Sequence, residues 1–201
     1  MGRLNVDMFV TLDGVAQAPG APQEDTEGGF QHGGWQAPFL DPEAGEHITR
    51  HIQDIDALLL GRKTYDIFAN HWPNAHGEIA RKLNEVPKYV ASRTLQGVDW
   101  QNSCLIEGDV ATAIPGIKAK HDQVHAIGST NLVQSLIEQG LVDRFNIWVY
   151  PVILGQGKRL FGTGTVPTGL RLAASKAFPG GGVLLTYDKA GKPHYGDLSQ
   201  P

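Results

Sequence analysis

A strand-to-helix turn at residues 56–65, with the sequence DALLLGRKTY, carries the clearest chemical signal in the chain. An apolar strand ends in Gly61, and Arg62, Lys63 and Thr64 follow where a helix should begin. Free backbone N–H groups at a helix start attract anions, and a glycine lets a ligand approach the backbone closely. We interpret this turn as a phosphate-binding segment; the alternative is a solvated strand–helix turn.

Two further strand ends show the same order of residue types. Residues 125–132 (HAIGSTNL) give a strand, a glycine and small polar residues before an amphipathic helix. Their N–H groups and hydroxyls could hold a pyrophosphate. Residues 89–94 (YVASRT) end in a hydroxyl and in Arg93, whose guanidinium can bind two phosphate oxygens.

Three such strand ends in one domain favour a single shared ligand site, because open α/β sheets bind ligands at the carboxyl ends of their strands. No G-x-G-x-x-G pattern occurs in the chain, so the ordinary Rossmann fingerprint is not supported. The candidate cofactor-binding residues are Gly61, Arg62, Lys63, Thr64, Ser92, Arg93, Thr94, Gly128, Ser129, Thr130, Asn131 and Leu132.

Two candidates for substrate binding lie in the segment after the first predicted strand. Asp13 could orient a polar substrate, or it could form a turn. Trp35 offers a stacking surface for a flat ring, or it anchors its Gly-rich loop. Both interpretations stay open for each residue.

Other substrate-side candidates lie further along the chain. Tyr65 could donate a proton, so it joins Asp13 as a candidate catalytic residue; alternatively it packs on its helix with Phe68. The cationic turn that contains Gly155, Lys158 and Arg159 could hold a substrate phosphate, or it is solvated surface.

The histidines give no recognisable metal motif. His47 and His51 are one helical turn apart, which is metal-ligand spacing, but the glutamate of a zinc protease motif is missing. We expect this pair on a solvated helix face, and we expect no metal site. The remaining histidines are scattered, among them His71, His76 and His125.

Neither Ser129 nor Cys104 has the surroundings of a nucleophile. The sequence around Ser129 lacks the second glycine of a G-x-S-x-G elbow. Cys104 lies in an apolar run, which predicts a buried structural thiol.

Short apolar runs alternate with helical segments along the chain, which predicts an α/β fold with a mainly parallel sheet. The expected strands are 4–10, 57–60, 88–91, 103–106, 124–127, 145–152, 171–178 and 183–187, with a glycine hairpin at 180–182. The expected helices are 42–53, 64–70, 77–84, 110–119 and 131–138.

Two stretches interrupt this alternation. Residues 11–40 are rich in Gly, Pro and acidic residues and are too long for an ordinary connection, so we expect a functional loop or lid. Residues 189–201 are polar and without periodicity, which predicts a loosely held tail after a single domain over 1–188.

The composition argues against several classes of partner. A net charge of -4 and a pI near 6.0 are unlike those of a nucleic-acid-binding surface. The sequence has no signal peptide pattern and no long apolar span, so we expect no membrane partner. A single cysteine cannot form an internal disulfide, which fits a reducing cytoplasm.

The ordered set of motifs resembles a known family. These motifs are residues 10–14 (VTLDG), 33–35 (GGW), 60–65 (LGRKTY), 92–94 (SRT), 128–129 (GS) and 151–157 (PVILGQG). Together they resemble the reductase domain of riboflavin biosynthesis, the RibD C-terminal type, which shares its fold with dihydrofolate reductase. The resemblance covers roughly residues 3–188 and implies a mixed sheet flanked by helices, NADPH as hydride donor, and a homodimer.

The resemblance also implies roles for the strand-end motifs. Residues 61–64 and 92–94 would bind the phosphates of the cofactor, including the 2′-phosphate that separates NADPH from NADH. Residues 128–132 would cradle the pyrophosphate. Ser129 stands where many relatives have a second glycine, so a hydroxyl occupies a position of close backbone approach.

Three hypotheses of function follow. The first is an NADPH-dependent reductase of a small heterocycle, either pteridine-like or pyrimidine-like, or an intermediate of riboflavin synthesis. The carboxylate of dihydrofolate reductase cannot be mapped onto this chain, which argues against folate. The chain also lacks the paired cysteines of a zinc deaminase, so a riboflavin reductase would work as a stand-alone domain. The second hypothesis is a nucleotide-binding protein without catalysis, and the third is an interaction module that uses the fold alone.

Overall fold

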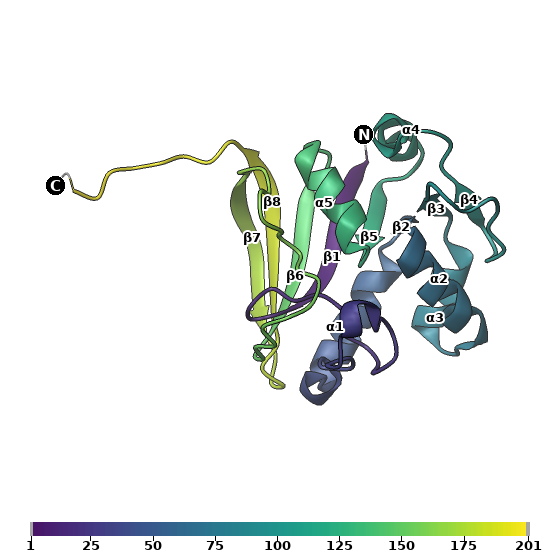
Figure 1. The fold of residues 1–201 in the computed structure, drawn as a ribbon, viewed down its shortest axis with the longest axis horizontal. Helices are drawn as coiled ribbons and strands as arrows, with labels where there is room; N and C mark the ends of the chain where they lie inside the picture. The colour runs from purple at the N-terminus through teal and green to yellow at the C-terminus, as the bar shows by residue number, and fades with distance from the viewer. Residues whose placement is uncertain (1, 200–201) are drawn as a thin grey trace.

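The computed structural model describes residues 2–199, which form one eight-stranded sheet with helices on both faces (Figure 1). The strand order is β4-β3-β2-β5-β1-β6-β8-β7. The strands are β1 (Arg3–Thr11), β2 (Ala57–Gly61), β3 (Lys88–Ala91), β4 (Ser103–Leu105), β5 (Gln123–Ile127), β6 (Arg144–Tyr150), β7 (Gly169–Ala177) and β8 (Val183–Gly191). Every predicted strand is present.

Parallel pairing dominates the sheet, as predicted. The strands β1 to β6 all pair in parallel, and only β8 and β7 run antiparallel to their neighbours. The β7–β8 hairpin closes through the predicted glycine turn, where the Phe178 N–H donates to the Gly182 carbonyl over 2.9 Å. The expected α/β fold is therefore confirmed.

The helices also match their predicted positions. They are α1 (Pro42–Gln53), α2 (Arg62–His71), α3 (Glu78–Glu85), α4 (Val110–Lys120) and α5 (Thr130–Glu138). The helix α2 begins at Arg62, two residues before the predicted start, because Gly61 is already its extended N-cap. The longest of these helices has twelve residues, and none of the helices within residues 2–199 is long and apolar enough to cross a membrane.

The central strands are buried on both faces, which explains their continuous apolar sequences. On one face, Leu4 and Val6 of β1 pack with Ile114 of α4 and Leu136 of α5.

The opposite face is covered by the other three helices. There, Leu58 and Leu60 of β2 pack with Ile52 of α1, Tyr65 of α2 and Leu83 of α3. Alternate residues of β2 therefore enter different cores, since Leu59 belongs to the first face.

Strand β6 lies inside the sheet between β1 and β8. Phe145 pairs with Val6 on one side and with Tyr187 on the other. The apolar sequence at 145–152 is thus explained by a central strand, and its backbone is not free to pair with another chain.

Two predictions near the edges of the fold need correction. Cys104 is exposed, not buried, because β4 is a three-residue strand at the end of the sheet. The tail begins after Gly191, not at 189, because β8 pairs with β7 as far as Gly191 and Gly169. Residues 192–199 then leave the sheet and extend away from it (Figure 1), and the last two residues of the predicted tail lie outside the described part.

Lys88 is a fully buried lysine at the start of β3. Its ammonium donates to the carbonyls of Asn84, Val86 and Gln101 over 2.8 to 3.0 Å and lies 4.3 Å from the centre of the Trp100 ring. Three hydrogen bonds satisfy all the donors of the ammonium, so Lys88 ties the end of α3 to the segment before β4.

We expect the substitution Lys88→Met to lower the free energy of unfolding by about 1–3 kcal/mol, because the buried Val86 carbonyl loses its donor and the part-buried carbonyls of Asn84 and Gln101 each lose one. Urea unfolding followed by tryptophan fluorescence would measure the change. The same substitution at the exposed Lys192 is the matched control and should leave stability unchanged. A Lys88→Met protein as stable as the wild type would show that these hydrogen bonds contribute nothing net.

Candidate functional site

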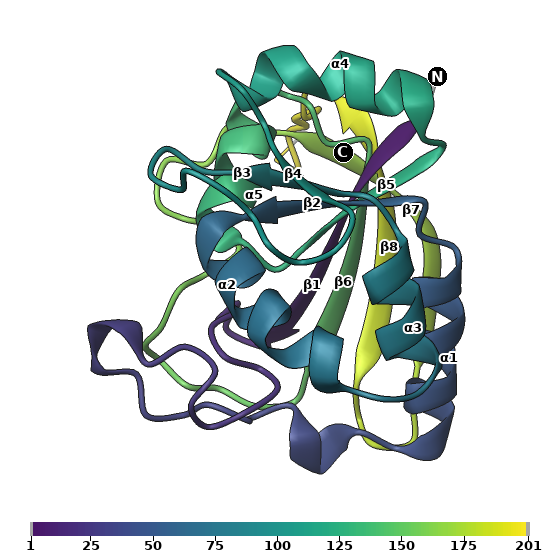
Figure 2. The same ribbon diagram turned by 90° about the vertical axis from the view of Figure 1, so that its right-hand side faces the viewer.

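A large cleft, of about 1310 Å³, opens at the carboxyl ends of the parallel strands. In Figure 2 the arrows of β2 and β3 point to the side of the sheet where α2 begins. All twelve predicted cofactor-binding residues line this cleft: Gly61, Arg62, Lys63, Thr64, Ser92, Arg93, Thr94, Gly128, Ser129, Thr130, Asn131 and Leu132. The three motifs, far apart in the sequence, are therefore neighbours in space.

Helices α2 and α5 both begin at the cleft, and no side chain within the described chain caps either of them. By contrast, the carboxylates of Asp41 and Asp109 cap α1 and α4. The first N–H groups of a helix have no intrahelical partner, and they carry the positive end of the helix dipole. The uncapped starts of α2 and α5 thus present donors to an anion in the cleft.

A direct hydrogen bond joins the two helix starts. The Gly61 N–H donates to the Ser129 Oγ over 2.8 Å, which explains why this serine caps no helix. A Cβ on Gly61 would lie 3.2 Å from the Ser129 side chain, so a larger residue would push the two turns apart. Gly128 and Ser129 have φ of +62° and +60°, a conformation that is easy for glycine and strained for serine.

Cationic side chains surround the same part of the cleft. The Arg62 guanidinium donates to the Thr94 hydroxyl over 3.0 Å, which connects the β2 and β3 ends, and Arg93 is exposed. Lys63 forms an ion pair with Glu27 of the long loop. Arg62 also lies 3.5 Å from the Asp66 carboxylate of its own helix, in an exposed pair that water screens. Arg62 and Arg93 therefore remain the cations best placed to meet a phosphate from solvent.

The long loop at residues 11–40 forms the wall opposite these turns. Residues 16–21 and 23–25 line the cleft, as expected of a functional loop. Trp35 does not line it: within residues 2–199 the indole is 7% exposed, donates to the Gln17 carbonyl over 2.8 Å and packs against Tyr150. Trp35 therefore anchors the loop, which was the alternative to a stacking surface.

Asp13 braces this loop and does not line the cleft in the described part of the chain. Its carboxylate accepts from the Thr11 hydroxyl over 2.6 Å, from the Gly155 N–H over 2.8 Å, and from Leu154 and Arg159 over 3.2 Å. The Thr11 hydrogen bond, helped by the two backbone N–H groups and opposed by burial, lowers the pKa of Asp13 to about 2. Asp13 is thus a turn-forming residue, and the substrate role drawn from the sequence has no geometric support.

The residues of the cationic turn at 155–159 have two different sets of contacts. Gly155 and Arg159 are bound to Asp13. Lys158 does line the cleft, and its ammonium lies 2.5 Å from carboxylate oxygens of Asp25 and Glu27. Because two carboxylates already neutralise Lys158, it is better suited to anchoring the loop at 11–40 than to binding a substrate phosphate.

Tyr65 is not placed as a proton donor to a ligand. Its side chain is buried, and its hydroxyl accepts hydrogen bonds from the Asp99 and Trp100 N–H groups over 2.9 and 3.0 Å. It packs in the core with Phe68, as the alternative interpretation had it. Both predicted catalytic candidates therefore have structural tasks.

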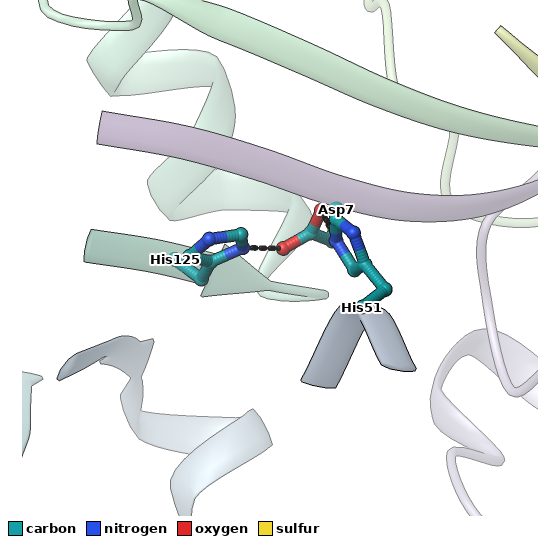
Figure 3. Close-up of side chains that lie close together, drawn as sticks. All are labelled: Asp7, His51 and His125. Carbon is teal, nitrogen blue, oxygen red and sulfur yellow. Dashed lines mark hydrogen bonds and ion pairs between the residues drawn. The ribbon is translucent and has the colours of Figure 1, made fainter. Parts of the chain in front are cut away.

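The structure brings together a polar cluster that the sequence analysis missed: Asp7 of β1, His51 of α1 and His125 of β5 (Figure 3). His125 Nδ1 lies 2.5 Å from one Asp7 carboxylate oxygen, and His51 Nε2 lies 2.8 Å from the other. Asn146 of β6 donates to the same oxygen as His51 over 2.8 Å. Asp7 also lines the cleft. The prediction of a solvated face for His51 is wrong, and His47 instead packs edge-on against Trp148.

Asp7 carries a charge in an otherwise apolar interior. Burial alone would raise its pKa, but the charge and hydrogen bond of His125, followed by those of His51, lower that pKa well below its usual range. In return, Asp7 and then Asp54 raise the pKa of His51 against the opposing effect of burial. The cluster therefore holds Asp7 ionised and favours the charged form of His51.

The same three side chains are of types that can bind a divalent cation. Two ligands of a tetrahedral zinc ion, with bonds of about 2.05 Å, lie about 3.3 Å apart. The nitrogen–oxygen separations here, 2.5 and 2.8 Å, are those of hydrogen bonds. In this arrangement the cluster shares protons.

Comparison with known proteins identifies the family. The RibD C-terminal domain family matches residues 3–184, and the chain belongs to it. This is a family of NADPH-dependent reductases. The resemblance drawn from the motifs is thereby confirmed.

The match to individual proteins extends over nearly the whole chain. The sequence is 28% identical over 191 residues to YyaP, an uncharacterised protein of Bacillus subtilis strain 168, covering 92% of this chain and 94% of YyaP. Among solved structures, a Shewanella sp. PV-4 protein provisionally assigned to riboflavin biosynthesis superposes with a TM-score of 0.71 at 21% identity, over 94% and 99% of the two chains. A pyrimidine reductase-like protein of Corynebacterium diphtheriae gives a TM-score of 0.65 at 13% identity, over 94% and 92%. At these identities the superpositions show the fold.

We expect Asp13→Ala to lower the midpoint of thermal unfolding by about 2–6 °C at pH 7, because the loop loses its brace. The carboxyl is ionised in the folded state down to about pH 2, against an ordinary value of 3.8, so its contribution is present above pH 3.8 and is lost as the pH falls toward 2. The difference between the two proteins should accordingly shrink at pH 3.

Thermal unfolding by circular dichroism at pH 7 and pH 3 measures this effect. Asp122→Ala, which removes an exposed carboxylate, is the control. Equal unfolding midpoints of Asp13→Ala and the wild type at pH 7 would show that Asp13 does not stabilise the loop. Its role as a substrate ligand would then become the better interpretation.

Proposed function

We propose that the protein is an NADPH-dependent reductase that transfers hydride to a small heterocyclic substrate, pteridine-like or pyrimidine-like or belonging to riboflavin synthesis. The observation that carries the proposal is the convergence on one cleft of three strand-end turns that contain glycines, hydroxyls and cations. Membership in a family of NADPH-dependent reductases supports it.

The residues in the cleft fit the cofactor. The uncapped starts of α2 and α5 would bind its pyrophosphate, and the Gly61–Ser129 hydrogen bond sets their separation. Arg62 and Arg93 would bind the 2′-phosphate, because each guanidinium group can donate to two phosphate oxygens. When bound, the nicotinamide ring supplies the hydride.

The remaining part of the cleft is suited to a flat ring. Phe9, Ile48, Ile52 and Ile127 line it, and Asp7 lies among them. Its volume of about 1310 Å³ exceeds the roughly 300–1,000 Å³ typical for a single ligand, which leaves room for a substrate beside a dinucleotide. These apolar side chains would form a wall that keeps water away from the site of hydride transfer. The long loop at 11–40 forms the opposite side of the cleft.

A nucleotide-binding protein without catalysis remains the second candidate. It is favoured by one observation: both catalytic candidates from the sequence, Asp13 and Tyr65, are engaged in structural hydrogen bonds. NADPH binding without oxidation by any pteridine or pyrimidine acceptor would support this second function.

Titration with NADPH and with NADH, followed by quenching of tryptophan fluorescence, tests the cofactor. We expect micromolar NADPH binding and much weaker NADH binding. Because a charged hydrogen bond contributes about 1.5–3 kcal/mol, Arg62→Ala and Arg93→Ala should each weaken NADPH about 10- to 100-fold and leave NADH nearly unchanged.

Arg81→Ala, an exposed arginine of α3 away from the cleft lining, is the matched control. Failure of the wild type to bind either nucleotide would overturn the proposal. Equal losses for NADPH and NADH in both variants would place the arginines on the pyrophosphate instead of the 2′-phosphate.

We also propose that the protein acts as a homodimer in the cytoplasm. Two exposed apolar side chains support the dimer, and buried or half-buried rings lie between them: Leu172 pairs across the sheet with Tyr187, Tyr187 pairs with the buried Phe145, and Phe145 contacts Phe161. Leu172 and Phe161 are 52% and 46% exposed. Exposed apolar clusters of this kind are typical of association surfaces.

Light scattering coupled to gel filtration measures the assembly. We expect twice the chain mass of 21.7 kDa for the wild type and a shift toward the monomer for Leu172→Lys. Leu198→Lys, an equally apolar but isolated position in the tail, is the control. A monomeric wild type at micromolar concentration would contradict the dimer.

A further inference from the structure

Beyond the strand-end turns, the cleft extends along an apolar wall that three helices build. Helix α3 packs on α1 and lies beside α2 (Figure 2). Each of the three places on the cleft two apolar residues that are four positions apart: Ile48 and Ile52 of α1, Phe68 and Trp72 at the end of α2, and Ile79 and Leu83 of α3. Residues four apart lie on the same face of a helix. These six residues, here called the helical wall, belong to one hydrophobic cluster.

The helical wall is packed against the core and still exposes apolar surface. Ile52 and Leu83 are buried. The half-buried members are Ile48, Phe68, Trp72 and Ile79. Because all of them line the cleft, part of their apolar surface meets water there. A ligand group that covers this surface removes it from water, which stabilises the complex.

The helical wall offers little to a polar group. Within the described part of the chain, no polar side chain of α1 or α3 lines the cleft, and the last turn of α2 adds the exposed His71. Hydroxyl groups held against such a wall would lose hydrogen bonds to water without replacing them. An aromatic or aliphatic group is therefore favoured here over a sugar or a polyol.

The position of the helical wall separates it from the cofactor phosphates and joins it to the ring site. Phe68 follows Arg62 by six residues on α2, so it lies about 9 Å further along the helix axis. Ile48 and Ile52 line the small cavity that Phe9 and Ile127 also line. A flat ring beside Phe9 and Ile127 would therefore place its substituent along the helical wall.

The charges on the cleft argue against a phosphate on the substrate. Within residues 2–199, the lysines and arginines that line the cleft are Arg62, Lys63, Arg93 and Lys158. The carboxylates that line it are Asp7, Glu24, Asp25 and Asp109. Lys158 is already paired with two carboxylates, and the other three cations belong to the turns proposed for NADPH. A substrate phosphate would compete with the cofactor for these cations or lie near carboxylates that repel it.

We propose that the substrate of this reductase is a heterocycle with an uncharged apolar substituent and no phosphate group. The ring binds beside Phe9 and Ile127, and the substituent lies along the helical wall. This inference rests on the reductase function proposed above and names the class of its substrate. The six residues of the helical wall determine specificity through the apolar area that they cover, and they take no part in hydride transfer.

Calorimetric titration of the NADP⁺ complex with three uracils that differ in one arm tests this substrate class. 6-(Benzylamino)uracil carries an apolar arm, 6-(methylamino)uracil carries almost none, and 6-(ribitylamino)uracil 5′-phosphate carries a phosphorylated polyol. We expect the benzyl compound to bind about 10- to 100-fold more tightly than the methyl compound, because one phenyl group leaves water. The phosphorylated compound should bind most weakly.

Equal affinities of the benzyl and methyl compounds would overturn the proposal. It would equally be overturned if the phosphorylated compound bound most tightly, or if the benzyl compound did not bind to the NADP⁺ complex.

Substitutions of Ile79 show whether the helical wall is responsible. Ile79→Trp fills the space in front of the wall, so the benzyl compound should bind no better than the methyl compound, while NADP⁺ affinity stays unchanged. Ile79→Ala removes part of the wall and should weaken the benzyl compound about 3- to 10-fold, with little effect on the methyl compound. A thermal melt verifies the fold of each variant.

Ile153→Trp is the matched control, because Ile153 is exposed and does not line the cleft. Wild-type affinity for the benzyl compound in both Ile79 variants, or an equal loss in Ile153→Trp, would overturn the role of the helical wall.

A second probe separates this inference from the reductase function. The uncharged dye N-phenyl-1-naphthylamine fluoresces strongly in apolar sites and needs no nucleotide. We expect saturable binding of the dye that Ile79→Trp abolishes and Ile153→Trp preserves. Absence of saturable binding in a protein that binds NADP⁺ would overturn the apolar substituent and leave the reductase in place. Dye binding by a protein that binds no nucleotide would overturn the reductase function, and with it the substrate assignment.

Discussion

Parallel pairing of β2 with β3 and with β5 is the constraint from which the cleft follows. Parallel strands end at the same edge of a sheet, and each must be followed by a connection that returns over a face. For β2 and β5 that connection begins at once with a helix, so α2 and α5 start side by side. Their unpaired N–H groups then face a common space. An antiparallel arrangement of the same segments would have separated these turns to opposite edges.

The turns depend on each other as well as on the sheet. The Gly61–Ser129 hydrogen bond joins the two helix starts, and the Arg62–Thr94 hydrogen bond connects them to the β3 end. Ser129 therefore has a role at this junction: its hydroxyl accepts from the Gly61 N–H. The strained φ of Ser129 is maintained by this contact and by the start of α5.

The buried charge of Asp7 imposes a second constraint. An unpaired carboxylate in this interior would be strongly disfavoured, so donors must come from three neighbouring elements: His125 from β5, Asn146 from β6 and His51 from α1. A buried carboxylate that needs this many partners stabilises the fold little more than apolar residues at the same positions would. Asp7 also lines the cleft, so this buried charge lies at the candidate site.

The sequence by itself determined the elements and the glycine- and cation-containing turns at the strand ends, because helix and strand periodicity and the glycine–cation order at 61–64 lie within a few neighbouring residues. Only the tertiary structure decided the tasks of single side chains. Asp13 and Trp35 had two interpretations each, and the choice depended on contacts with Gly155 and Gln17, which no local pattern encodes. The Asp7 cluster joins residues 44 and 118 positions apart, and it exists only because β5 and α1 pack against β1. The one sequence signal was a charged residue in the middle of an apolar strand, which reveals a constraint but not the partners that satisfy it.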